Sequence, residues 1–127
     1  MESRKTSRSR DWFLKAPIAS IKLQELFTDL EFNALSLAAQ AVAIRAGWLC
    51  FALGEVPDDP FVVAQMTMGD ANEFERQWPA VRRIFITLDN GNLTHDWWTE
   101  KREAAYMRQA RARIAAKLSH SSRKQKH

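Results

Sequence analysis

The stretch FITLDNGNLTHDWW, residues 85–98, decides the fold because it carries the only strong turn signal between two short alternating runs. Apolar and polar residues alternate on both sides of Asp89-Asn90-Gly91-Asn92. Asn and Gly tolerate the positive φ angles that tight hairpin turns require. We therefore predict an antiparallel β-hairpin from Phe85 to Asp96 that turns at Asp89 to Asn92.

The residues before the hairpin favour helices. Ser36 is a predicted N-cap for a helix over residues 37–53, which Gly54 ends. Apolar residues surround this helix on all sides, so we expect it to be buried, with Trp48 almost fully buried at the centre. Pro60 fits the first turn of a short second helix.

A third helix and a fourth complete the predicted order. Asp70 with Glu73 resembles a capping box at the start of the third helix, which Pro79 should kink. Thr99 is the predicted N-cap of a long last helix from Glu100 to about Leu118. Two helices joined by a turn and followed by a two-stranded ribbon form the winged helix-turn-helix arrangement. The fold class is therefore mostly α with one β-hairpin (α+β), with a long basic C-terminal helix.

Length and composition indicate one globular domain. The chain has 127 residues, and we place a winged-helix domain at residues 11–118 between basic tails, predicted to be disordered, at residues 1–10 and 119–127. The single cysteine, Cys50, fits a reducing cytoplasm and excludes an intrachain disulfide framework. The N-terminus lacks the apolar stretch of a secretory signal. Gln40 and Arg45 interrupt the longest apolar run, so no membrane span is expected.

Charge is distributed unevenly along the chain. The first ten residues hold four Lys or Arg against one Glu, a net charge of +3. Residues 101–127 hold nine Lys or Arg against one Glu, a net charge of +8. The intervening residues hold six basic and thirteen acidic side chains, a net charge of −7. Basic ends on an acidic body are typical of proteins that bind nucleic acid or acidic surfaces, and also of solvated tails.

The last helix carries the strongest functional signal. On a helical wheel its apolar residues form one stripe, which consists of Ala104, Met107, Ile114, Ala115 and Leu118. Basic residues lie opposite the stripe or at its flank, namely Arg102, Arg113, Lys117, Lys101 and Arg108. Such a helix can lie on phosphates or on an acidic partner, or it can simply pack on the domain. Its apolar side chains are too small to predict membrane insertion.

The third helix and the hairpin supply the remaining candidate contacts. In a winged helix, the outer face of the third helix meets the partner, and here it offers Asn72, Arg76, Arg82 and Arg83. The acidic residues Asp70, Glu73 and Glu75 oppose these arginines, so the helix has no net attraction for phosphate. The predicted wing residues are Asp89, Asn90, Asn92 and His95.

Enzymatic chemistry is not expected. His95 and Asp96 are adjacent on a predicted strand and therefore point to opposite faces, with no third metal ligand at a fitting spacing. Asp58 and Asp59 lie in a proline-bounded loop, where carboxylates more often cap a helix. No glycine-rich phosphate loop or nucleophile motif occurs among the four glycines. We predict no catalytic residues, no metal and no cofactor.

Four segments in this order resemble the YdaU-like domain of unknown function, which occurs in phage and prophage replication proteins. They are LSLAAQAVAIRAGWLC, GEVPDDPFVVAQM, EFERQWPAVRRIF and DNGNLTHDWWTEKREAA, and they span roughly residues 35–113. The matching positions are Leu35, Ser36, Trp48, Pro57, Asp58, Asp59, Trp78, Phe85, Asp89, Gly91, Glu100 and Arg102. The turn DNG and the aromatic-rich HDWW depart from the family pattern. The resemblance implies a winged-helix module with a replication-related role in a bacterial host.

Two functions remain open at this point. The first is a nucleic-acid-binding winged-helix protein of a phage or prophage, with basic ends that grip the phosphates of duplex DNA. The second is an adapter or inhibitor that uses the same fold to bind a host or phage protein complex. The acidic body favours the second function, and the resemblance favours the first.

Overall fold

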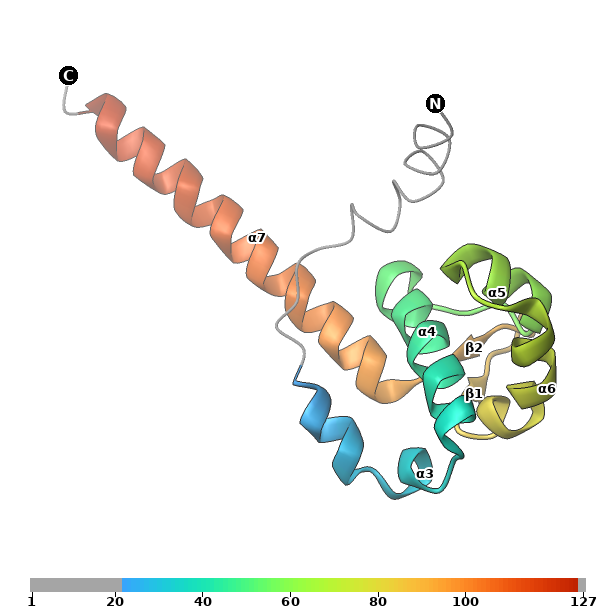
Figure 1. The fold of residues 1–127 in the computed structure, drawn as a ribbon. Coiled ribbons are helices and arrows are strands. Elements are labelled where there is room, and N and C mark those ends of the chain that lie inside the picture. The colour runs from blue at the N-terminus through green and yellow to red at the C-terminus, as the bar shows by residue number, and fades with distance from the viewer. Residues whose placement is uncertain (1–21, 126–127) are drawn as a thin grey trace, which may run out of the picture.

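Helix α4 (Leu37–Leu53) runs through the body of the protein, and the helices α5, α6 and α7 pack around it (Figure 1). The computed structural model describes residues 22–125. The predicted tail at residues 1–10 lies outside this range. The chain is mostly helical, with a single two-stranded sheet within the described residues, which confirms the predicted α+β class.

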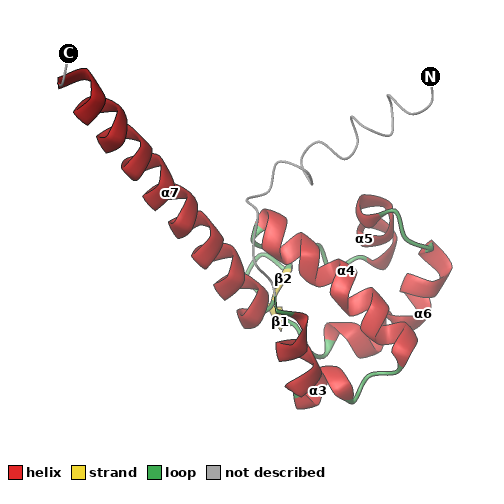
Figure 2. Ribbon diagram, turned by 60° about the vertical axis from the view of Figure 1, so that its left-hand side comes forward, coloured by secondary structure: helices red, strands yellow, loops and turns green. Residues whose placement is uncertain are grey.

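The elements follow in the order that the sequence predicts, with two short additions at the start. A 3-10 helix, η1 (Leu23–Thr28), and a one-turn helix, α3 (Leu30–Asn33), precede α4. Then come α5 (Pro60–Thr67), α6 (Ala71–Arg82), the strands β1 (Ile86–Thr87) and β2 (Leu93–Thr94), and α7 (Asp96–Gln125). Figure 2 shows the long α7 leaving the body on the side of α4 that lies away from α6.

Side-chain caps fix the helix starts. The side chain of Ser36 accepts a hydrogen bond from the backbone N–H of Ala39, and that of Asp70 accepts one from Glu73, at 3.1 Å each. These bonds satisfy N–H groups that the first turn of a helix leaves without an intrahelical partner. Gly54 ends α4 in a left-handed conformation with φ of 92°, as predicted. The helix α6 runs through Pro79.

The hairpin turns where the sequence predicts, but its strands are only two residues long. Ile86 pairs with Thr94 and Thr87 pairs with Leu93. On the side away from β1, Leu93 forms two backbone hydrogen bonds with Val56, at 2.7 and 2.8 Å. Val56 lies in the segment that connects α4 to α5. Both backbone polar groups of the buried Leu93 are therefore satisfied by Val56.

The last helix begins and ends beyond the predicted limits. It starts at Asp96 rather than Glu100, and it continues to Gln125 rather than ending near Leu118. Asp96 therefore belongs to the helix and not to the hairpin, and it suits the first turn because an acidic side chain there complements the helix dipole. Thr99 is not the cap: its hydroxyl lies within the first turn and donates to the backbone oxygen of His95 at 2.9 Å.

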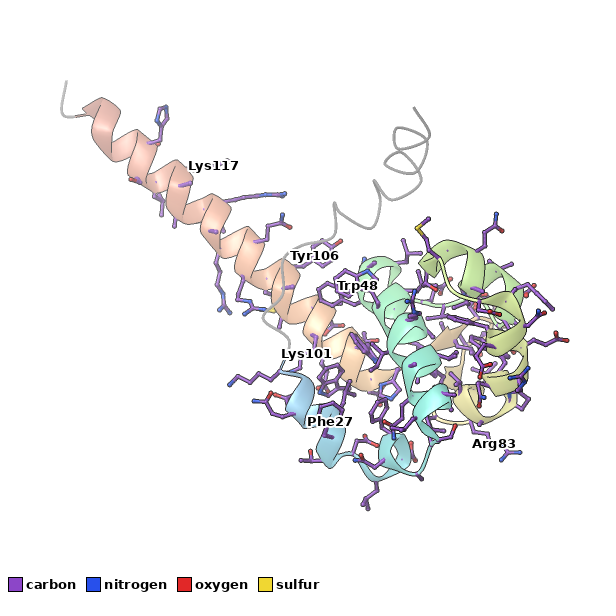
Figure 3. The ribbon with its side chains drawn as sticks, viewed as in Figure 1. Phe27, Trp48, Arg83, Lys101, Tyr106 and Lys117 are labelled. Atoms are coloured by element: carbon purple, nitrogen blue, oxygen red, sulfur yellow. The ribbon has the colours of Figure 1, made fainter. Side chains whose placement is uncertain are left out.

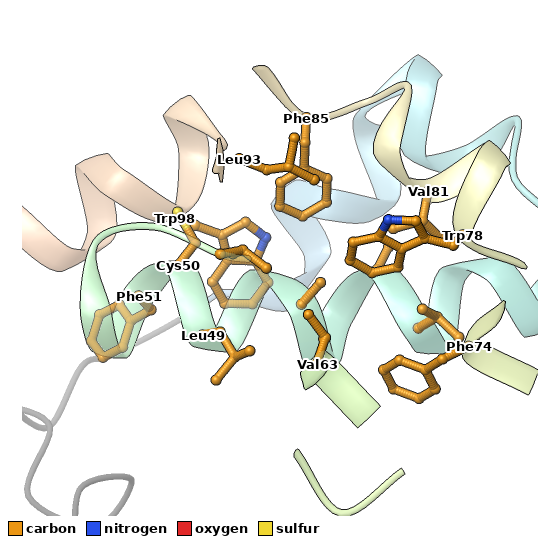
Figure 4. Close-up of a cluster of buried hydrophobic side chains, with 14 of the residues drawn as sticks. Leu49, Cys50, Phe51, Val63, Phe74, Trp78, Val81, Phe85, Leu93 and Trp98 are labelled. Carbon is orange, nitrogen blue, oxygen red and sulfur yellow. The ribbon is translucent and has the colours of Figure 1, made fainter. Parts of the chain in front are cut away.

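Trp98, and not Trp48, is the tryptophan that joins α4 to α7. Trp98 is 4% exposed and belongs to the buried cluster in Figure 4, whereas Trp48 is only partly buried and stacks on Phe51 at the edge of the core. The prediction of near-complete burial for Trp48 was wrong because α4 is apolar on every side, so its pattern does not show which face α7 covers. A Cβ atom at Gly47 would overlap the indole ring of Trp98.

We expect Gly47→Ala to lower the free energy of unfolding by about 1–3 kcal/mol, because the added methyl group overpacks the contact between α4 and α7. Alanine is otherwise the better helix former, by about 1 kcal/mol. The same substitution in a Trp98→Leu background should therefore be neutral or stabilising. Urea denaturation of the four proteins measures the difference, and an equal effect of Gly47→Ala in both backgrounds would contradict the proposed packing.

Candidate functional site

The helix α7 has an anchored part and a projecting part. Ala105 is its last buried residue, at 2% exposure, and every residue from Tyr106 to Ser121 is exposed. We call residues 106–121 the distal segment of α7. Figure 3 shows Lys117 on this segment, away from the body that carries Arg83.

The two parts use opposite faces of the helix. Trp98 and Ala105 face the body, and at about 100° per residue they lie on one side of the helical wheel. Met107, Ile114 and Leu118 lie on the other side, and they are 55%, 58% and 66% exposed. The predicted apolar stripe therefore exists as a surface, but it points away from the domain instead of packing on it.

The distal segment is surrounded by positive charge. Arg108, Arg113 and Lys117 are exposed there, as the sequence predicts, together with Arg111, which the prediction left out. None of the four side chains forms a hydrogen bond or an ion pair with another residue whose side chain the structure describes. No acidic residue follows Glu103 in the sequence. Arg111 could have been found from this run of uncompensated charge, but it lies next to the apolar stripe rather than opposite it.

The two basic residues at the start of α7 are engaged with the protein itself. Nη1 of Arg102 donates to the backbone oxygens of Phe51 and Ala52, at 2.7 and 2.6 Å. These carbonyls lie in the last turn of α4, where a helix leaves carbonyl groups without partners. Lys101 forms an ion pair with Glu25 at 2.8 Å, and this hydrogen bond lowers the pKa of Glu25, with a second one from Trp97. Both of these predicted phosphate contacts are therefore already bonded within the protein.

The face of α6 is largely neutralised. Arg76 pairs with Glu73 at 2.8 Å, and Arg82 pairs with Asp58 at 2.6 Å. The hydrogen bond from Arg82 is the main reason that the pKa of Asp58 is lowered. Of the four residues predicted on this face, Asn72 and Arg83 are exposed and make no ion pair within the described part of the chain.

The predicted wing residues have separate roles. Asn90 and Asn92 donate from their side-chain amides to Glu55, which lies just after α4, and so fasten the hairpin tip to the body. Asp89 is exposed at the turn. His95 is not on the hairpin tip: it lies directly before α7, where its ring meets Phe85 edge-on with 5.3 Å between the ring centroids.

A hollow of about 490 Å³ opens beside His95. Carboxylates from two regions of the chain line it, and they are Asp29 and Glu31 around the start of α3 and Asp96 and Glu100 at the start of α7. The rest of the lining consists of Arg83, Ile84, Phe85, Ile86 and Trp97. We call this region the acidic hollow. Burial lowers the pKa of His95, although the nearby Asp29, Asp96 and Glu31 act in the opposite direction.

Comparison of the chain with protein-family models, with curated proteins and with solved structures finds no match. The resemblance to the YdaU-like domain therefore stays a prediction. Within residues 22–125 no group of three or more His, Cys, Asp or Glu is arranged to hold a metal ion. No helix in the same range is both long and apolar enough to cross a membrane.

We expect Arg102→Ala to destabilise the protein by about 1–3 kcal/mol, because two carbonyl groups at the end of α4 lose a charged donor. The matched control is Arg108→Ala, which removes the same side chain from the distal segment and should change stability by less than about 0.5 kcal/mol. Urea denaturation measures both. Equal denaturation midpoints for the two variants would show that the contact of Arg102 with α4 contributes nothing.

His95 should make stability depend on pH. Its folded pKa lies below the ordinary 6.5, so the folded state binds a proton less readily than the unfolded state. The contribution of the neutral His95 to the free energy of unfolding is complete above pH 6.5. It is lost as the pH falls from there through the folded pKa of His95. His95→Asn should flatten the stability profile in this range. Parallel profiles for wild type and His95→Asn would contradict the assignment.

Proposed function

We propose that this chain is a non-enzymatic nucleic-acid-binding protein that holds the phosphates of duplex DNA with the distal segment of α7. The single observation that carries this proposal is the exposed set Arg108, Arg111, Arg113 and Lys117, which has no acidic neighbour after Glu103 and no ion pair within residues 22–125. Cationic side chains on such a surface gain affinity for DNA by releasing counterions condensed on the phosphates.

The order of the elements supports a winged helix-turn-helix as the body of this protein. A helix (α4) is followed by a bridging residue (Val56), two helices (α5 and α6) and the hairpin β1–β2. In winged helices that bind DNA, the helix before the hairpin enters the major groove. Here α6 occupies that place, and Asn72 on the helix and Arg83 directly after it are exposed without an ion pair in the described part of the chain.

The electrostatics favour α7 over α6 as the phosphate-binding element. The arginines Arg76 and Arg82 on α6 are already paired with carboxylates of the same chain, and the exposed Glu75 adds negative charge. In Figures 1 and 2, α6 and the distal segment lie on opposite sides of α4. We therefore assign the nonspecific phosphate contacts to the distal segment alone, and any reading of base edges to α6.

The resemblance to the YdaU-like domain supports a replication-related role in the cytoplasm of a bacterium that carries a phage or prophage. The second candidate function is an adapter or inhibitor of a host or phage protein complex. The observation that favours it is the exposed apolar stripe of Met107, Ile114 and Leu118, because phosphate contacts do not require apolar side chains.

A salt titration tests the phosphate grip. Each phosphate contact on duplex DNA contributes a slope of about −0.9 to log affinity against log salt. Changing Arg108, Arg111, Arg113 and Lys117 to Ala should flatten the slope by roughly four contacts' worth. Alanine favours helix, so the segment should stay helical. Fluorescence anisotropy with labelled duplex DNA, single-stranded DNA and RNA measures the affinities.

The control variant for this titration is Arg76→Ala with Arg83→Ala, which removes two positive charges from the α6 surface. It should bind with nearly the wild-type salt slope. Equal salt slopes for wild type and the distal variant would refute phosphate binding by α7. A salt slope that only the α6 variant changes would place the interface on α6 instead.

A further inference from the structure

This chain has two exposed apolar surfaces, one flanked by basic side chains and the other by acidic side chains. The first is the stripe on the distal segment of α7, where Arg111 and Lys117 flank Met107, Ile114 and Leu118. Exposed apolar side chains that line up on one face of a helix mark an interaction surface, because water contact with them is unfavourable. Nothing among residues 22–125 covers this face.

The second surface lies around α3 and the acidic hollow. Leu30, which lies between the lining residues Asp29 and Glu31, is 87% exposed, and Ile86, which lines the hollow, is 50% exposed. Glu31 and Glu100 are exposed in the same lining and form no ion pair within the described residues. This surface therefore offers apolar contacts edged by unpaired carboxylates.

The two surfaces complement each other in charge and in character. An apolar stripe flanked by arginine and lysine suits an apolar patch flanked by glutamates, since each charge then meets its opposite. Two distal segments packed on each other would instead bring positive side chains together. The acidic hollow, for its part, repels nucleic acid and attracts a cationic segment.

The two surfaces cannot meet within one molecule. The acidic hollow is lined by Asp96 and Glu100 in the first turns of α7, and the stripe begins at Met107 on the same unbroken helix. A continuous helix rises about 1.5 Å per residue and does not fold back on itself. The stripe is therefore carried away from the hollow that it fits.

We propose that the chain self-associates by docking the distal segment of α7 of one copy on α3 and the acidic hollow of a second copy. The stripe of Met107, Ile114 and Leu118 contacts the region of Leu30 and Ile86, while Arg111 and Lys117 approach Glu31 and Glu100. If each of two copies docks its α7 on the other, a closed dimer forms. If each copy docks on a different neighbour, longer chains form. This contact does not depend on nucleic-acid binding.

Charge exchange between two variants provides the test. The body variant is Glu31→Lys with Glu100→Lys, and the helix variant is Arg111→Glu with Lys117→Glu. All four side chains are free of ion pairs within residues 22–125, so the folds should persist, as far-UV circular dichroism can verify. Sedimentation velocity at low salt, on protein stripped of nucleic acid by nuclease and high salt, measures the mass.

Wild type should sediment as two or more copies, and each variant alone should sediment as a single copy, because like charges then face each other. An equimolar mixture of the two variants should associate again, because the reversed body meets a reversed helix and the unchanged surfaces also match. The control Glu75→Lys with Asp89→Lys changes charge by the same amount elsewhere on the body and should associate as wild type does. A single-copy wild type, or a mixture that does not associate, overturns the proposal.

A variant without any charge change tests the apolar part. Ile114→Ala with Leu118→Ala should weaken self-association at least tenfold, while the four basic side chains on which the DNA-binding proposal rests stay in place. Self-association equal to that of wild type would show that the stripe is not the docking face. Because this readout uses no nucleic acid, failure of the DNA-binding proposal and failure of self-association are distinguishable.

Discussion

Trp98 fills the space that Gly47 leaves on the surface of α4, and this contact determines where α7 begins and in which direction it leaves the body. Only a residue without a side chain allows the indole ring to approach the helix backbone so closely. Arg102 reinforces the contact one turn later by bonding to the last carbonyls of α4. With these two residues fixed, the face of α7 that meets the body is fixed, and so is the opposite face that meets solvent.

Much of the fold could be predicted because its signals are local. The caps Ser36, Asp70 and Gly54 and the turn at Asp89 to Asn92 each act within a few residues, so the sequence shows them directly. The choice between Trp48 and Trp98 as the buried residue is not local, since it depends on which face of an all-apolar helix another helix covers. The start of α7 was missed because the alternation of the hairpin continues through Asp96 in the sequence and Thr99 is a good cap in isolation.

The candidate site was predictable in its charge but not in its pairing. The run of basic residues after Glu103 is visible in the sequence, and the structure leaves Arg108, Arg113 and Lys117 exposed. By contrast, the partners of Lys101, Arg102 and Arg82 lie between 24 and 76 positions away in the chain, and those of Arg102 are backbone carbonyls. The periodicity of the sequence shows neither kind of partner. The same holds for the acidic hollow, whose carboxylates come together only when α3 meets the start of α7.

The projecting form of α7 has a consequence for how the protein can change over time. Residues 107–121 are exposed, so substitutions there alter the surface that a partner meets without removing a buried side chain from the body. Many proteins lose stability when a binding surface is remodelled, because the same side chains serve packing and recognition. In the proposed function the two tasks are divided along one helix, with packing before Tyr106 and partner contacts after it. The distal segment can therefore acquire new partners under selection for binding alone, provided that each substitution keeps it helical.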